Sequence, residues 1–347
     1  MQGPVCPVPV AHNEQIVIGH GSGGKMTSNL INKSFLPQFD NPVLNEGNDA
    51  GVITLDSRLR LAISTDSHVV SPLFFPGGDI GKLAVCGTVN DVAMMGATPL
   101  YLTAGFIIEE GLNLSVLNQI IVSMKDAAQE ANVEIIAGDT KVVQRGYGDG
   151  LYINTSGIGV FKHNFDISGS SAKPGDLVIL SGSIGDHGMA VLTARNELGF
   201  EVDIKSDIAP LNHLVSSMLD TSEKIHVLRD PTRGGVASTL NEIASQSHIC
   251  IELDETSIPV HPHVNAICEM LGFDPLYVAN EGKLIAIVAR DDADKILGKM
   301  HKTQYGKEAV IVGEVKESPQ DRVLMRTSIG SLRVVETLSG ELLPRIC

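Results

Sequence analysis

The sequence ends in a thiol, Cys347, within the motif LPRIC. Chain ends are usually the least ordered part of a domain, and the last dozen residues, from Glu336, are rich in small, polar and turn-forming side chains. Fully stretched, such a segment reaches on the order of 40 Å. Prenylation is excluded, because its signal places the cysteine four residues from the end. We therefore expect a mobile tail at 331–347 that carries a nucleophilic sulfur at its tip; the alternative is a cysteine that stands there by chance.

A glycine-rich loop near the start, GHGSGGK at 19–25, has the G-x-x-x-x-G-K spacing of a phosphate-binding P-loop. Its flanks predict a strand at 14–18 and a helix at 27–35, the context that this motif requires. The loop departs from the motif at Met26, where Ser or Thr should bind Mg²⁺, and Thr27 comes one position too late. It is thus a true P-loop, a plain turn or another kind of glycine loop over phosphates. We favour the last, since glycine-rich backbone can aim N–H groups at phosphates.

Acidic residues recur where the chain changes direction, at Asp49, Asp66, Asp91, Asp139 and Asp230. Aspartate at strand ends is common as a turn or cap residue, and each of these, taken alone, has that explanation. Asp91 differs, because it lies in an otherwise apolar helical pattern, where an unpaired carboxylate is costly. Such a residue needs a partner, and Mg²⁺ is a strong candidate because it prefers hard oxygen ligands.

Two further segments combine acids and bases. AGDTKVVQRG at 137–146 brings a carboxylate, a hydroxyl, Lys141 and Arg145 together after an apolar run, and VANEGKL at 278–284 sets Glu281 and Lys283 beside a small-residue turn. Surface ion pairs are the alternative explanation for both. The histidines show no H-x-x-x-H spacing, which disfavours a histidine metal site.

The composition narrows the classes of partner. A net charge of −15 over 347 residues argues against nucleic acid and anionic membranes, and the absence of Trp argues against stacking on bases. A polyanion such as ATP would then need a metal ion between its phosphates and the carboxylates. No run of 18 apolar residues exists, so we expect no transmembrane helix, and 1–14 lacks the regions of a signal peptide.

The cysteines indicate the compartment. Five of them, at 6, 86, 250, 268 and 347, are odd in number, far apart and never in a CxxC pair. This pattern fits a reducing cytoplasm without a zinc site. Cys86 and Cys268 lie in apolar helical patterns, and we expect both in the core.

Strand-like and helical patterns alternate in two halves, which predicts an α+β (α/β-like) protein with two lobes. Pro174 and Gly175 have the order of a type II turn, and we place the domain boundary near 163–174. The expected domains are 1–165, 172–330 and the tail 331–347. Beyond the strand and helix at the glycine loop, the expected helices are 80–95, 114–130, 186–197, 208–220, 234–247 and 263–271, and the expected strands are 51–55, 60–65, 133–137, 151–160, 177–181, 249–253, 284–289 and 309–315.

Taken together, these segments resemble one family over almost the whole chain, the HypE carbamoyl dehydratases of nickel–iron hydrogenase maturation. The matching stretches are HGSGGKM, ISTDSHVVSPLFFPGGDIGKLAVCGTVNDVA, GDTKVVQRG, GDHG, RDPTRGG, NEGKL and PRIC. GDTKVVQRG and PRIC are the most specific of these. The ISTD, NDVA and DPTRGG elements also resemble the wider superfamily of aminoimidazole ribonucleotide synthetases and selenophosphate synthetases. Residues 1–14 match nothing in these patterns.

The resemblance implies a two-lobed synthetase fold whose first lobe binds ATP with Mg²⁺ and forms a homodimer through its strands. It also implies that a partner carbamoyltransferase loads a carbamoyl group onto the terminal cysteine. The enzyme then uses ATP to dehydrate the S-carboxamide to S-cyanide, and the cyanide passes to iron on a scaffold complex of two other maturation proteins. This scheme is chemically reasonable. An amide oxygen is a poor leaving group, and phosphorylation converts it into phosphate, which is a good one. A thiol on a tail can also reach several active sites in turn.

Roles follow residue by residue from the resemblance. Cys347 carries the carbamoyl and then the cyano group, and Lys141 and Glu281 match the family's deprotonation pair. Lys141 can be a base only if its pKa is lowered; otherwise Glu281 takes the proton and Lys141 holds a phosphate, and both assignments remain open. The metal candidates are Asp49, Asp66, Asp91 and Asp230. The nucleotide candidates are Gly21, Ser22, Gly23, Gly24, Lys25, Asn90, Asp139 and Thr140.

Three other functions compete. A P-loop enzyme predicts that Lys25 is essential and Cys347 dispensable, and a non-catalytic scaffold predicts no nucleotide hydrolysis. A selenophosphate-synthetase-like activity would want its reactive cysteine near the glycine loop, and none lies between Cys6 and Cys86.

Overall fold

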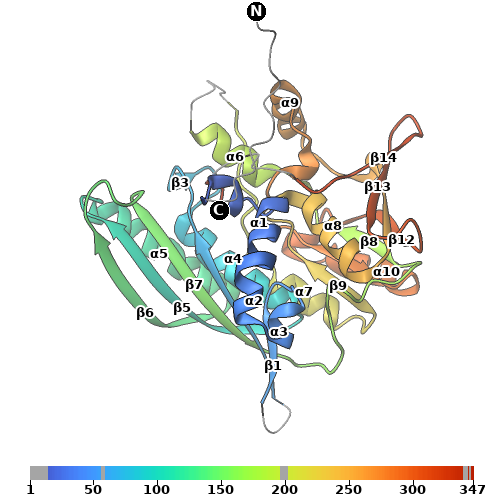
Figure 1. Ribbon diagram of the computed structural model, residues 1–347, viewed down its shortest axis with the longest axis horizontal. Helices are drawn as coiled ribbons and strands as arrows, with labels where there is room; N and C mark the ends of the chain where they lie inside the picture. Colours follow the sequence, from blue (N-terminus) through green and yellow to red (C-terminus); the bar gives the residue numbers. More distant parts are fainter. Residues whose placement is uncertain (1–14, 56–58, 196–201, 339–342, 344) are drawn as a thin grey trace, which may run out of the picture.

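The computed structural model describes residues 15–55, 59–195, 202–338, 343 and 345–347. Within these ranges the chain forms two lobes, each built on one large sheet, and a two-stranded ribbon of β3 (Phe74–Phe75) and β4 (Gly78–Asp79). Figure 1 shows the first sheet with α5 on one side of the molecule and the second sheet on the other. Two lobes of mixed helix and sheet agree with the expected fold class.

The first sheet is mixed and has one open face. In the described part of the chain its order is β1-β2-β7-β5-β6, and only β5 and β6 run parallel. Two helices pack over its inner face, where Leu102, Leu151 and Ile153 are buried. The elements are β1 (Gly51–Thr54), β2 (Arg60–His68), α4 (Ile80–Met94), β5 (Thr98–Glu109), α5 (Leu114–Ala131), β6 (Glu134–Val143) and β7 (Leu151–Val160).

The second sheet has the order β14-β13-β10-β12-β8-β11-β9 for the residues described, and its strands β8, β11 and β9 are buried on both faces. Along β11, Ile285 and Ile287 belong to the core beneath α8, whereas Ala286 and Val288 belong to the core beneath α7 and α10. Burial on both faces explains why this strand reads as a continuous apolar run.

Its remaining elements complete the second lobe, and α6 and α9 pack on each other beside the sheet. They are β8 (Leu177–Leu180), α6 (Asp186–Ala194), α7 (Asn212–Leu219), β9 (Ile225–Arg229), α8 (Gly235–Ser247), β10 (Cys250–Asp254), α9 (Pro262–Leu271), β11 (Ile285–Val288), α10 (Arg290–Met300), β12 (Val310–Lys316), β13 (Arg322–Arg326) and β14 (Leu332–Val334).

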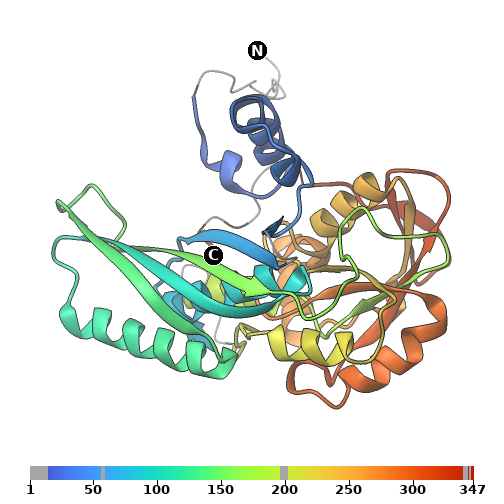
Figure 2. The same ribbon diagram turned by 90° about the horizontal axis from the view of Figure 1, so that it is seen from below.

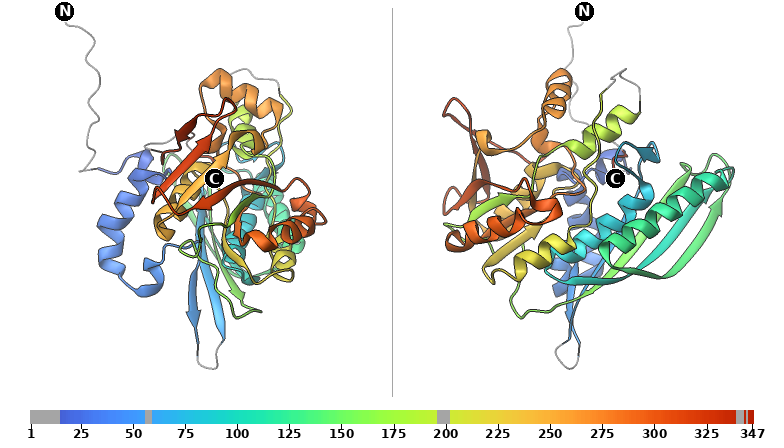
Figure 3. Two further views of the ribbon diagram at one scale, coloured as in Figure 1. Left: turned by 90° about the vertical axis from the view of Figure 1, so that its right-hand side faces the viewer. Right: turned by 180° about the vertical axis from the view of Figure 1, so that it is seen from behind.

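The N-terminal helices stand outside this two-lobed body, as Figures 2 and 3 show. They are α1 (Lys25–Leu30), a π-helical turn at Ile31–Phe35, α2 (Leu36–Phe39) and α3 (Pro42–Asn45). Together they confirm the helix expected at 27–35. The strand expected at 14–18 is wrong over its described part, because a 3-10 turn (Ile18–Gly21) stands there and 15–17 carry no strand. Residue 14 lies outside the described residues.

Helix α4 and the segment 206–211 join the lobes. Asn90, inside α4, accepts a hydrogen bond from the Leu211 N–H and donates to the carbonyls of Ala209 and Glu281. The helix is buried almost all round, because the first sheet covers one side and the second lobe the other. This explains its largely apolar sequence, and the carboxylate of Asp91 lies in that setting.

Most expected elements are present with small shifts at their ends, and Cys86 and Cys268 are buried as expected. The type II turn is confirmed by the Asp176 N–H to Lys173 carbonyl bond and the φ of +95° at Gly175. The helix expected at 208–220 begins only at Asn212, and the end of the helix expected at 186–197 lies outside the described residues. No helix among those described is long and apolar enough to cross a membrane.

Candidate active site

Residues 345–347 lie against the segment that follows β2 and against α6, and Figure 1 marks the C-terminus within the body of the molecule. The carbonyl of Cys347 accepts from the Val69 N–H at 3.1 Å, and the carbonyl of Arg345 accepts from the Ser71 N–H at 3.2 Å. Ile346 is 5% exposed and joins the core of the first lobe. Cys347 is therefore docked, whereas the mobility expected for 331–347 stays a prediction; the described part of that segment also contains β14.

The Cys347 thiol faces an acid and a base. It lies within hydrogen-bonding reach of the Glu281 carboxyl and shares a cavity with the Arg233 guanidinium. Burial, together with the nearby carboxylates, raises the pKa of the thiol well above its usual range. The sulfur lines a cavity of about 290 Å³ between the tail, the glycine loop and the loop that carries Arg233.

A second, smaller cavity of about 160 Å³ adjoins the first, since Arg233 lines both. We call it the acidic pocket; its lining carboxylates are Asp49, Asp91, Asp230 and Glu242. The Ser64 hydroxyl donates to Asp91 at 2.6 Å, and the Arg229 guanidinium donates to Asp49. Asp66 is held by the Ser67 N–H at 2.8 Å and lies beside His68. The four aspartates that the sequence grouped as metal candidates are thus brought near one another.

The charges in this region are poorly balanced. Burial and the neighbouring carboxylates raise the pKa of Asp91 and Glu281 well above their usual ranges. Burial raises the pKa of Asp230 to about 8 and that of Glu242 to about 7. Asp66 is the exception: burial opposes its ionisation, but His68 and Arg233 outweigh this effect and lower its pKa. The acidic pocket therefore favours the arrival of a cation.

The carboxylates fit Mg²⁺ only together with another ligand. Among the described residues, no three acidic, histidine or cysteine side chains are arranged so that they alone could hold a metal ion. Oδ2 of Asp49 is buried without a hydrogen-bond partner, which leaves an oxygen free for a cation. Mg²⁺ is commonly held by one or two carboxylates plus substrate phosphates, and this donor set matches that arrangement.

The glycine loop lies against the second lobe. The Arg233 side chain donates to the Gly21 carbonyl at 2.9 Å. Gly23 has a φ of +76°, and a Cβ at this position would lie only 2.9 Å from the Arg233 side chain. Gly21 and Ser22 line the thiol cavity and Gly23 the acidic pocket. Gly24 approaches the Leu338 carbonyl, and that carbonyl accepts from the Lys25 N–H at 3.0 Å. Because the preceding strand is missing, the context required for a P-loop is not met.

Three predicted residues lie away from the thiol. Asp139, Thr140 and Lys141 belong to β6, an edge strand on which nine of ten residues are exposed. Lys141 pairs with Asp139 at 2.8 Å in solvent. The register places Asp139 in line with Ser67 across three strand spacings, about 14 Å. One chain therefore does not bring the predicted pair of Lys141 and Glu281 together.

Asn90, a predicted nucleotide ligand, has another task, because backbone groups of the lobe junction occupy both ends of its side-chain amide. The sequence reasoning also gave no role to Arg233, Glu242 or His68. Glu242 is hidden in an ordinary helix pattern, whereas Arg233 stands in the quoted DPTRGG motif and could have been found there. His68 is 1% exposed, its Nε2 lies 3.1 Å from Oδ2 of Asp66, and its Nδ1 has no hydrogen-bond partner among the described residues.

The comparisons with known proteins agree with this architecture. Models of the AIR synthase related protein, N-terminal and C-terminal domains, match residues 47–161 and 173–326. The chain therefore belongs to the AIR synthase related proteins, a class defined by this pair of domains. Within that class its relatives are specific.

The carbamoyl dehydratase HypE of Cupriavidus necator is 54% identical over 333 residues, which cover 96% of this chain and 95% of the relative. A crystal structure of a HypE–HypF complex contains a chain 51% identical, with a TM-score of 0.85, covering 89% of this chain and 99% of that one. A structure of HypE in complex with ATP is 48% identical, with a TM-score of 0.81, covering 96% and 100%. The family resemblance is confirmed: the chain is a member of the HypE family.

Proposed function

We propose that this protein uses ATP to dehydrate an S-carboxamide on Cys347 to an S-cyanide, which supplies cyanide for the iron centre of nickel–iron hydrogenase. The observation that carries this proposal is the Cys347 thiol, placed beside Glu281 in a cavity that adjoins the acidic pocket. The relative named carbamoyl dehydratase and the ATP-bound structure of a relative support it.

The proposed reaction needs a proton acceptor and a place for the phosphate. Phosphoryl transfer from ATP forms a bond between the γ-phosphorus and the carboxamide oxygen and breaks the bond to ADP. The C–O bond then breaks, phosphate leaves, and the nitrogen loses its two protons, so that carboxamide and ATP give nitrile, ADP and phosphate. Glu281 is the proton acceptor of this proposal, because it lies beside the Cys347 sulfur and its Oε1 is buried without a hydrogen-bond partner among the described residues. Burial raises the pKa of Glu281, which makes its carboxylate a stronger base. Arg233, between the two cavities, stabilises negative charge on the transferred group.

Mg²⁺ would supply charge neutralisation for the phosphates, with Asp49, Asp91 and Asp230 as its protein ligands. The poor balance of charge in the acidic pocket supports this assignment. Asp66 is the weaker candidate, because His68 already lies 3.1 Å from one of its oxygens.

Loading with carbamoyl takes place outside this cavity. The thiolate is the nucleophilic form of cysteine, and the docked Cys347 has a pKa well above the usual range because it is buried. We propose that the tail leaves the cavity to react in a carbamoyltransferase and returns for dehydration. The crystal structure of a HypE–HypF complex supports a partner of this kind. Transfer of the cyanide to a scaffold complex of two maturation proteins in the cytoplasm completes the proposal.

A homodimer would complete the site. The first sheet has an uncovered face with exposed Ile63, Tyr101 and Ile158, and β6 is a ten-residue edge strand with exposed Ile136. Long unpaired edges are ready to bind another chain. We propose that a second copy covers β6, and that Lys141 acts only in that assembly, either as base or as phosphate ligand. If the wild type sediments as a dimer and Ile136→Lys as a monomer, this proposal is supported.

The decisive test is the mass of the C-terminal peptide after incubation with a carbamoyltransferase, its carbamoyl donor, ATP and Mg²⁺. We expect a carboxamide adduct on Cys347 that loses one water only when ATP is present. Cys347→Ser should fold and bind ATP without forming either adduct. ATP-dependent cyanylation of Cys347→Ser, or none in the wild type once the carboxamide has formed, would refute the proposal.

A further inference from the structure

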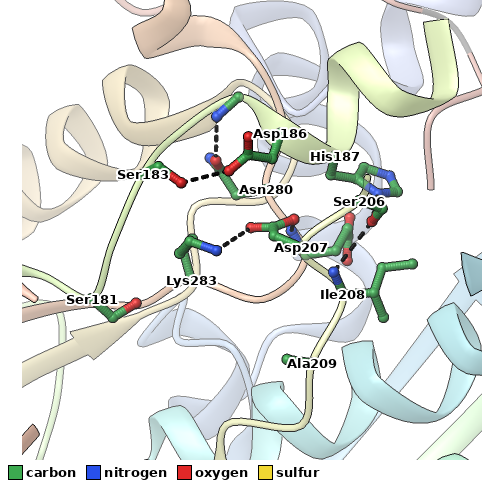
Figure 4. A network of polar contacts seen from close by, with 12 residues as sticks. Ser181, Ser183, Asp186, His187, Ser206, Asp207, Ile208, Ala209, Asn280 and Lys283 are labelled. Carbon is green, nitrogen blue, oxygen red and sulfur yellow. Dashed lines mark hydrogen bonds and ion pairs between the residues drawn. The ribbon is translucent and has the colours of Figure 1, made fainter. Parts of the chain in front are cut away.

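One buried histidine holds the tail next to its thiol. His187, at the start of α6, is fully buried, and its Nε2 lies 2.7 Å from the carbonyl oxygen of Ile346. A carbonyl can only accept, so Nε2 carries the proton and Nδ1 accepts from the Ser206 hydroxyl at 2.8 Å. The Ser206 oxygen in turn accepts from the Ile208 N–H at 3.2 Å. Figure 4 shows the imidazole of His187 directed at Ser206.

Asp207, which follows Ser206 in the chain, holds Glu281 in place. The Asp207 carboxylate accepts from the Glu281 N–H at 3.0 Å and from the Lys283 ammonium at 3.1 Å. The Asp207 backbone lies so close to Gly282 that a Cβ there would meet the Asp207 carbonyl oxygen at 1.7 Å. Figure 4 shows Lys283 and Asp207 pointing at each other. Glu281 is thus fixed by contacts on both sides of its peptide.

We propose that Ser206 and Asp207 form a shared positioning element: through His187 it fixes the tail that bears Cys347, and through its own carboxylate it fixes Glu281. The proposal rests on the proposed function for its catalytic consequence. His187 is a positioning residue, since it contacts the residue before the reactive cysteine. One rigid dipeptide then sets the distance between the sulfur and the proton acceptor, as a reaction between positioned groups requires.

The same contacts imply that the His187 bond has opposite effects on loading and on dehydration. Loading of Cys347 requires the tail outside the cavity, so the His187 bond opposes it. Dehydration requires the tail inside, so the bond promotes it. A purely structural histidine would change both steps together through the folded fraction.

Alkylation of Cys347 by iodoacetamide in the full-length protein measures docking without any catalysis. In His187→Phe, which keeps an aromatic ring and lacks the donor, we expect the Cys347 peptide to react at least ten-fold faster than in the wild type. His187→Gln, which can donate to the same carbonyl, should return the rate to within about three-fold. The buried Cys86 in the same peptide map must stay unreactive, which reports that the fold is intact.

His301→Phe is the matched control, because His301 also lies 2.8 Å from a backbone carbonyl, that of Ala309, yet has no contact with the tail among the described residues. Its Cys347 rate should equal the wild-type rate. Ser206→Ala tests the same bond from the other side, should His187→Phe fail to fold, and we expect a rise of at least three-fold. Equal Cys347 rates in a folded His187→Phe, or in Ser206→Ala if the histidine variant does not fold, would overturn the proposal.

The rates of loading and of cyanylation complete the test. With the tail carbamoylated beforehand, His187→Phe should lower the rate of cyanylation at least ten-fold, while the loading rate is unchanged or higher. If the wild type forms no cyanide but the alkylation difference is present, the tail contact stands and the proposed function fails. If the wild type is cyanylated and His187→Phe matches it, the positioning role is overturned.

Discussion

Two buried polar clusters lie on either side of Glu281, and they treat the same residue type in opposite ways. In the acidic pocket, burial and like charges raise the pKa of Asp91 and Asp230. In the positioning element, burial also opposes ionisation of Asp207, but the Lys283 ammonium and the hydrogen bond from the Glu281 N–H outweigh it, and the pKa of Asp207 is lowered. Asp230 is buried and Asp91 and Asp207 are each partly buried, so depth alone does not decide the outcome. The positioning element, in which Asp207 has its partners, has a structural role. The acidic pocket has too few positive partners for its carboxylates and is suited to bind a ligand.

The unpartnered atoms follow the same division. Among the described residues, Oδ2 of Asp49 and Oε1 of Glu281 are buried without a hydrogen-bond partner, whereas both oxygens of Asp207 have donors. Leaving such a group unpaired costs free energy. It is tolerated where a substrate supplies the missing partner, and four experiments test this difference.

Glu281→Gln should give the largest effect. The amide keeps the shape of the side chain but cannot accept the proton, so dehydration should slow by at least about 100-fold while the carboxamide accumulates on Cys347. Glu308→Gln, at the rim of a neighbouring cavity, is the control and should cyanylate normally. Peptide mass spectrometry follows both. A normal cyanylation rate in Glu281→Gln would mean that the unpaired oxygen is not the acceptor.

Lys283→Met tests the satisfied cluster. It leaves Asp207 buried without its cation, and breaking such a pair costs about 3–5 kcal/mol of the free energy of unfolding. Adding Asp207→Asn in the same chain should recover part of that loss. Urea denaturation measures both. A loss below about 1 kcal/mol would show that the pair is not a support.

Asp91→Asn should have the reverse signature. We expect Mg²⁺-dependent ATP binding at least ten-fold weaker by calorimetry, yet a metal-free protein more resistant to heat, because a repelled buried carboxylate has been removed. Weaker ATP binding without a gain in the metal-free melting temperature would assign Asp91 a structural hydrogen-bonding role, and unchanged affinity would remove it from the metal site.

The smallest effect is a pH dependence. The pKa of Asp230 is about 8 in the folded protein against 3.8 ordinarily, so its contribution to stability is complete below about pH 4 and is lost as the pH rises toward 8. Between pH 6 and 8 the ionisation of Asp230 alone should lower the free energy of unfolding of the metal-free protein by up to about 1.4 kcal/mol per pH unit. Asp230→Asn and added Mg²⁺ should each flatten this slope. A metal-free protein equally stable at pH 6 and 8 would contradict the expected charge state.

The sequence carried the parts of the fold that depend on local periodicity. The apolar stripe of α5 and the alternation of β7 were predicted within a residue of their ends, because one face of each is buried. β5, the partner of both β6 and β7, was missed, since Pro99 and Gly105 interrupt its pattern and its pairing is non-local. The strand before the glycine loop was wrong, because Ile16 and Ile18 are exposed and pack on no sheet of the described chain, and a 3-10 turn begins at Ile18.

For the site, motif matching selected Asp49, Asp66, Asp91, Asp230, Glu281 and Cys347 as candidates, and the fold brings these residues near one another from distant segments. Their roles stay predictions. It could not find Glu242 or the link from His187 through Ser206, because these contacts depend on tertiary packing and leave no spacing in the sequence. It also could not tell that Lys141 lies on an exposed edge. Whether that lysine joins the site depends on a second chain, and no pattern within one chain records such a contact.

The docked sulfur has a consequence for the chemical lifetime of the protein. Oxidation of cysteine begins from an accessible thiolate, and beyond the reversible sulfenic acid it gives sulfinic and sulfonic acids that are lost as nucleophiles. In the proposed function, a Cys347 oxidised that far could not accept another carbamoyl group. Seated in its cavity, the sulfur keeps its proton and is partly shielded from solvent. The docked state thus protects the reactive sulfur from oxidation, and peroxide should oxidise Cys347 chiefly when the tail has left its cavity.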